Sequence, residues 1–107
     1  MPTAFDPLQN HAISRTDAAV LIQAQSAQAA PGEHLATVFN RSAFERILAQ
    51  AGCAGIRVYR ARHADGTPTL VLVGVDADGQ DLATEQSEFA QFGTNCPPFC
   101  PSPWFQG

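Results

Sequence analysis

The sequence predicts an α+β fold, in which two helices pack on a small antiparallel β-meander of three to four strands and a C-terminal tail docks on the core. Three observations predict it: an apolar run between two Asp-Gly turns, two segments with apolar residues at helical spacing, and a tail rich in Cys, Pro and aromatic residues. The chain of 107 residues has the length of one domain, residues 1–107, with one modest core. It divides into an extended arm (1–12), an α+β core (13–92) and the tail (93–107).

The apolar run over residues 69–76, TLVLVGVD, predicts the central strand. Because side chains alternate between the faces of a strand, its leucines would point to one face and its valines to the other. A strand with two apolar faces needs a neighbour on each side and cover on both faces. The Asp-Gly turns predict those neighbours, a strand over residues 56–63 before the run and a return over residues 80–84 after it.

Helical spacing and capping residues predict two helices and one short strand between them. Ser14 is the expected N-cap of a helix over residues 15–29. Ser42 and Glu45 form an S-x-x-E capping box ahead of an apolar stripe, which predicts the second helix. Residues 34–40 alternate between apolar and polar side chains, and they predict the short strand.

The tail has a composition unlike the rest of the chain. It is not expected to be a disordered linker, because Phe99, Trp104 and Phe105 are costly to leave in water. We therefore expect these side chains to dock on the sheet or on a partner.

Charge and hydropathy exclude several classes of partner. The chain has six arginines, no lysine and ten acidic residues. Its net charge of −4 argues against nucleic acid and against an anionic membrane as the partner. No segment is long and apolar enough to span a bilayer, and the first residues show no secretory signal. We therefore expect a cytoplasmic protein, in which cysteines indicate metal binding, redox chemistry or packing before a structural disulfide.

The strongest chemical signal is the segment Cys96-Pro-Pro-Phe-Cys100. Two thiolates at this spacing on a proline-stiffened loop can bind one metal ion, and zinc or an iron–sulfur cluster is the expected cofactor. A complete site needs further ligands. The candidates are the remaining thiol and histidines near strand ends, so that the predicted metal ligands are Cys53, Cys96, Cys100, His34 and His63.

Two other interpretations of the cysteines stay open. The pair Cys96 and Cys100 can be a disulfide or a redox pair, and all three cysteines can be small buried apolar residues. The sequence alone does not decide among the three.

Three arginines lie on the predicted strand over residues 56–63. Since neighbouring residues of a strand face opposite ways, Arg57 cannot join Arg60 and Arg62 in one patch. Arg60 and Arg62 share a face, where they can bind an anion or a carboxylate or remain solvated at the strand end.

Several segments together resemble those of a known group of proteins. The chain carries GCAGIRVYRA, then TLVLVGVD, and finally CPPFC. This combination resembles a family of short, uncharacterised bacterial proteins with GC-x-GIR-x-Y, LVLVGVD and terminal CPP-x-C segments. The resemblance implies that Cys53, Cys96 and Cys100 belong to one pattern, and it implies no activity.

No motif of a known catalytic mechanism is present: the chain has no nucleophile elbow, phosphate loop, dinucleotide fingerprint or zincin histidine pair. The sequence therefore favours a non-enzymatic structural or interaction protein, which forms a homo-oligomer or binds a protein partner through its sheet face and aromatic tail. The alternative is a metal, iron–sulfur or thiol redox module that uses the three cysteines.

Overall fold

The computed structural model describes residues 4–106 and confirms the α+β fold. The chain divides into two compact units, unit 1 with residues 37–94 and the arm up to residue 9, and unit 2 with residues 10–36 and the chain from residue 95 onward. The expectation of a single domain over residues 1–107 stays a prediction. Within residues 4–106, no helix is both long and apolar enough to cross a membrane.

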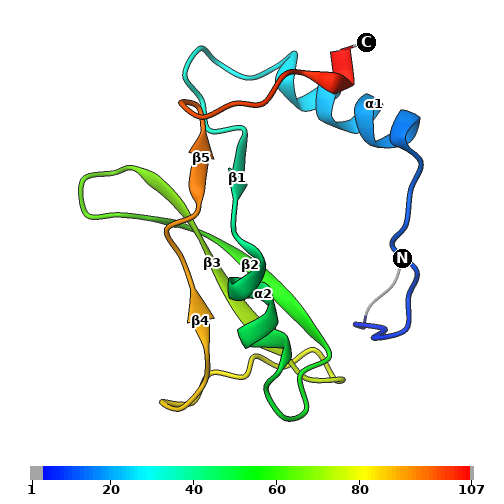
Figure 1. Ribbon diagram of the computed structural model, residues 1–107, viewed down its shortest axis with the longest axis vertical. Helices are drawn as coiled ribbons and strands as arrows, with labels where there is room; N and C mark the ends of the chain where they lie inside the picture. The colour runs from blue at the N-terminus through cyan, green and yellow to red at the C-terminus, as the bar shows by residue number, and fades with distance from the viewer. Residues whose placement is uncertain (1–3, 107) are drawn as a thin grey trace. The chain divides into compact units, whose positions relative to one another are not determined.

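Unit 1 is built on a three-stranded antiparallel sheet of β2 (Gly55–Arg62), β3 (Pro68–Val75) and β4 (Phe89–Ala90), in that order (Figure 1). The prediction that the apolar run is the central strand is confirmed. β2 pairs with β3 over its whole length, whereas β4 pairs with only two residues of β3.

The turn between β2 and β3 forms where the sequence predicts it. Gly66 adopts a positive φ of 89°, and the His63 N–H donates to the Thr67 carbonyl over 2.9 Å. The Asp65 carboxylate accepts the Thr67 N–H over 2.9 Å, and this hydrogen bond lowers the pKa of Asp65. A short polar side chain and a glycine thus close the hairpin.

The prediction that residues 80–84 form the third strand of the sheet is wrong. Only an isolated bridge between Val75 and Asp81 forms there, and β4 supplies the third strand. The Asp76 carboxylate accepts the Asp78 and Gln80 N–H groups, each over 2.9 Å, and so holds the chain in a turn. A second turn follows at Thr84, which leaves too few extended residues for a strand between the two.

The core of unit 1 lies between β3 and the helix α2 (Arg41–Leu48). Ile47 of α2 and Leu72 of β3 are its most buried large side chains, 1% and 2% exposed. A Cβ at Gly74 would lie 3.2 Å from Ile47 Cγ2 and 3.1 Å from Cys53 Sγ. The glycine in the central strand therefore lets α2 approach the sheet closely.

The opposite face of β3 is covered in part by the N-terminal arm. A Cβ at Gly55 would lie 3.2 Å from Phe5 Cζ, and one at Gly79 would lie 3.0 Å from Phe5 Cβ. Val73 and Val75, which point to this face, are buried. The arm, which the sequence predicts as extended, thus supplies cover for the face that α2 does not reach.

The N-cap of α2 differs from the predicted capping box. The cap is Asn40, whose side-chain oxygen accepts the Ala43 N–H over 3.2 Å and the Ser42 hydroxyl over 2.8 Å. Ser42 donates to Asn40 instead of capping the helix itself. The helix therefore starts one residue before Ser42, because asparagine serves as well as serine at this position.

Unit 2 contains the helix α1 (Arg15–Ser26) and the short 3₁₀ helix η1 (Trp104–Gln106). As predicted, Ser14 caps α1, its hydroxyl accepting the Asp17 N–H over 3.0 Å, but the helix ends before residue 29. The tail contacts α1: the Gln23 side-chain amide donates to the Phe105 carbonyl, and the Arg15 guanidinium lies 5.3 Å from the Trp104 ring centroid. Docking of the tail on the sheet stays a prediction.

A two-stranded sheet of β1 (Ala36–Val38) and β5 (Thr94–Cys96) forms where the chain passes from one unit to the other. β1 lies inside the predicted strand over residues 34–40, and β5 was not predicted. Because β5 ends at Cys96, it fixes the position of the cysteine loop within unit 2.

Candidate functional site

The cysteine loop of unit 2 is closed by a disulfide between Cys96 and Cys100, whose Cα atoms lie 4.8 Å apart. Cys96 is buried, and its carbonyl accepts the Leu35 N–H over 2.8 Å. The Phe99 side chain is exposed, and its N–H donates to the Asn95 carbonyl over 3.1 Å. The disulfide is one of the alternatives that the sequence left open.

The third cysteine, Cys53, lies in unit 1 as a half-buried free thiol that donates to the Gly55 carbonyl over 3.3 Å. His63 lies just beyond the other end of β2, where its ring stacks on Phe92 with centroids 4.4 Å apart. At about 3.3 Å per residue, the strand between Cys53 and His63 is roughly 26 Å long. The structure therefore does not bring these two residues together.

The remaining predicted ligand, His34, is half-buried in unit 2. Over residues 4–106, the structure forms no group of three or more His, Cys, Asp or Glu side chains that could hold a metal ion. With Cys96 and Cys100 bonded to each other, their sulfurs are not thiolate ligands. Zinc or iron–sulfur binding by the reduced chain stays a prediction.

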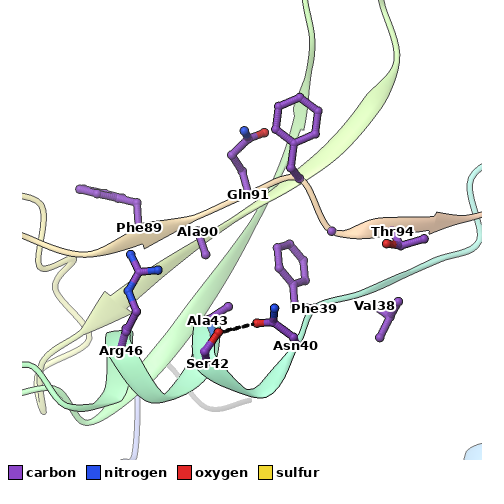
Figure 2. A pocket seen from close by; sticks show the side chains of 12 residues that line it. Val38, Phe39, Asn40, Ser42, Ala43, Arg46, Phe89, Ala90, Gln91 and Thr94 are labelled. Carbon is purple, nitrogen blue, oxygen red and sulfur yellow. Dashed lines mark hydrogen bonds between the residues drawn. The ribbon is translucent and has the colours of Figure 1, made fainter.

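An open pocket of about 600 Å³ in unit 1 was not predicted from the sequence. It lies between α2 and the segment that joins β4 to β5, and Figure 2 shows Phe39 and Ala90 pointing into it. Both apolar and polar residues line it: Val38, Phe39, Asn40, Ser42, Ala43, Arg46, Phe89, Ala90, Gln91, Phe92, Gly93 and Thr94.

The backbone at one end of the pocket requires unusual residues. Phe92 adopts a positive φ of 64°, and a Cβ at Gly93 would lie 2.8 Å from Phe39 Cε2 and 2.9 Å from the Val38 carbonyl oxygen. Only glycine fits this close approach of two backbone segments. The Phe-Gly pair in the sequence was the available signal, and it predicts a turn but not a pocket.

Three of the five polar side chains that line the pocket have partners within the chain. The Arg46 guanidinium binds the Glu88 carboxylate over 2.8 Å, and the side chains of Asn40 and Ser42 bond to each other at the helix N-terminus. Val38 and Phe92 remain 64% and 71% exposed at the edge of the pocket. The charged lining residue of the pocket is thus paired, and the exposed edge of the pocket is apolar.

The sheet face opposite α2 carries a polar cluster of Arg57, Tyr59 and Asp81. The Asp81 carboxylate accepts hydrogen bonds from the Tyr59 hydroxyl and the Arg57 guanidinium, which also donates to the Gly79 carbonyl over 3.0 Å. The bond from Tyr59, then the bond and charge of Arg57, lower the pKa of Asp81. The bond to Asp81, followed by burial, raises the pKa of Tyr59.

These two shifts act at opposite ends of the pH range. Asp81, with a lowered pKa in the folded chain, contributes stability above its unfolded pKa, and this contribution is lost as the pH falls through the folded value. Tyr59, with a raised pKa, contributes stability below its unfolded pKa, and this contribution is lost as the pH rises through the folded value. The cluster is therefore intact between the two values.

The tyrosinate absorbance of Tyr59 tests this cluster directly, because it is the only tyrosine of the chain. We expect Tyr59 to ionise above the ordinary pKa of tyrosine, and at a lower pH in Asp81→Asn, which removes the accepting carboxylate charge. Asp65→Asn is the control, because it neutralises a carboxylate at the hairpin turn. Equal titration midpoints for the wild type and Asp81→Asn would contradict the assignment.

No protein-family model, no curated protein and no solved structure matches this chain. The resemblance of its GIRVYRA, LVLVGVD and CPPFC segments to one bacterial family therefore stays a prediction.

Proposed function

We propose that the chain is a non-enzymatic interaction protein that associates with copies of itself. The observation that carries the proposal is the pocket of unit 1 with its exposed apolar edge, Val38, Phe89 and Phe92. Single exposed apolar residues are ordinary on a protein surface, but a group of them around a hollow is typical of an interface. The exposed Phe99 and Trp104 side chains add apolar surface in unit 2.

The charge of the pocket supports a second copy as the occupant. Arg46 is neutralised by Glu88, so that the pocket offers no free charge to a nucleotide, a phosphate or a metal ion. An aromatic side chain such as the exposed Phe92 of another copy has a matching character. Such a contact builds a closed ring if the rotation between successive copies closes, and an open filament if it does not.

Sedimentation velocity over a range of protein concentrations tests the proposal. We expect the wild-type chain to sediment faster as its concentration rises. The Phe92→Asn variant should reach the same degree of association only at a protein concentration at least about tenfold higher, because burial of a Phe side chain contributes about 1.5–3 kcal/mol. Asparagine is chosen because it tolerates the positive φ at this position.

Leu8→Asn is the matched control, since Leu8 is 90% exposed and lies in the arm, outside the pocket. The control is expected to associate like the wild type. A wild-type chain that stays monomeric at every concentration, or an equal effect of the two variants, would overturn the proposal.

The second candidate function is a thiol redox module, and the Cys96–Cys100 disulfide favours it. In a reducing cytoplasm such a bond is transient and serves catalysis or redox sensing. With this second function we propose that the protein is cytoplasmic, where the disulfide would form and be reduced again. A permanent structural disulfide would instead require an oxidising compartment.

A further inference from the structure

β2 is an open edge strand. Among residues 4–106 it has β3 as its only neighbour in the sheet, although it is eight residues long. Four of its consecutive residues, from Arg57 to Arg60, are exposed. A strand edge of this length presents a row of backbone donors and acceptors that can pair with another chain.

Hydrogen bonds at the ends of the ladder show which backbone groups point outward. The His63 N–H donates to the Thr67 carbonyl, and this pair continues the register of β2 and β3, so the odd-numbered residues of β2 bond to β3. The Gly74 carbonyl instead faces the other way and accepts from Leu82 over 2.8 Å. The groups of β2 that point away from β3 therefore belong to its even-numbered residues, Ile56, Val58, Arg60 and Arg62.

The same even-numbered residues place one apolar and two basic side chains in a row. Val58, Arg60 and Arg62 share a face of the strand and are all exposed. Arg62 donates to the Gly66 carbonyl over 3.1 Å, which leaves most of its donors unused, and Arg60 makes no side-chain bond or ion pair with residues 4–106. Arg57, on the other face, is held by Asp81.

The half of the hairpin that carries these arginines is also incomplete as a sheet. β4 pairs with β3 only at Leu72 and Val73, so toward the turn the sheet has two strands. A two-stranded ribbon is marginally stable by itself in water, and a third strand makes it stable. An added strand would thus stabilise this half most.

We propose that the β2 edge binds an extended acidic segment of a partner protein by strand addition. Backbone groups of the segment pair with the outward N–H and C=O groups of Val58 and Arg60. Its carboxylates, two residues apart, lie opposite Arg60 and Arg62, and an apolar side chain lies on Val58. The proposal does not depend on self-association, because the pocket lining contains no residue of β2.

Fluorescence anisotropy of an end-labelled synthetic peptide, in which Thr alternates with Glu, Glu and Val so that these three share one face, tests the charge requirement. We expect the full chain to bind it, to bind more weakly as salt is raised, and not to bind the same peptide with Lys in place of Glu. Arg60→Gln is expected to weaken binding about two- to fivefold. Arg41→Gln, which removes an exposed arginine on α2, is expected to bind like the wild type.

Amide hydrogen exchange tests the strand addition. In the free chain we expect slow exchange at residues 57, 59 and 61 and fast exchange at residues 58, 60 and 62. The peptide should slow exchange at the even-numbered set. Val58→Pro removes one outward donor at a strand edge, where proline is tolerated, and is expected to weaken binding about fivefold.

Two outcomes would overturn the proposal. If Arg60→Gln and the wild type bind the acidic peptide equally, the arginines only protect the edge from pairing with other strands. If the peptide binds without slowing the even-numbered amides, the contact is electrostatic and no strand is added.

Discussion

Ile47→Ala is expected to lower the free energy of unfolding of unit 1 by about 2–5 kcal/mol. Ile47 is 1% exposed, and its Cγ2 methyl group lies close to the backbone of the central strand at Gly74. Loss of these atoms leaves a cavity that a helix and a strand cannot close by a small movement. The measurement is urea unfolding followed by far-ultraviolet circular dichroism.

Leu48→Ala is the matched control, because it removes a similar volume from the next residue of the same helix. Leu48 is 50% exposed, so we expect a loss of about 1 kcal/mol or less. Comparable losses for the two variants would show that α2 does not pack on β3 through Ile47. Since small domains are stable by about 5–15 kcal/mol, the Ile47 variant should be visibly less folded at moderate urea.

Loss of the Cys96–Cys100 disulfide is expected to have the second largest effect. Replacing both cysteines with alanine should lower the free energy of unfolding of unit 2 by about 2 kcal/mol, the loop-closure entropy of a ring of this length. Trp104, the only tryptophan of the chain, lies on α1 in the same unit, so its fluorescence reports this unfolding.

Cys53→Ala is the control for the disulfide, because Cys53 is a free thiol of unit 1. It should leave the Trp104 transition in place. A double-alanine variant that unfolds like the wild type would mean that the disulfide does not constrain unit 2. That result would strengthen the second candidate function, in which the bond serves redox exchange instead of stability.

The central part of the fold could be predicted because local signals agree with one another. The valines and leucines of β3 alternate, Asp65 and Gly66 have the residue types of a hairpin turn, and Ser14 caps α1 as its type indicates. In each case the residues that carry the signal lie next to the structure that they specify.

The remaining features depend on contacts between residues far apart in the sequence. Phe5 lies close to Gly55 and Gly79 on the sheet, and Phe39 lies close to Gly93 at one end of the pocket. The pairing of Cys96 with Cys100 depends on the compartment as well as on the spacing, which is why the sequence left it open. Cys53 and His63 do not lie together, because an extended strand separates them.

The shortness of β4 decides where unit 1 loosens first. Because β4 meets β3 only at Leu72 and Val73, the hairpin beyond them is held by a single ladder of backbone hydrogen bonds and by the stacking of His63 on Phe92. The least costly opening of the unit on warming therefore starts at the turn around Asp65 and Gly66 and proceeds toward α2. A protease that cuts after arginine would reach Arg62 and Arg60 in this frayed state before it reached Arg57 or the core.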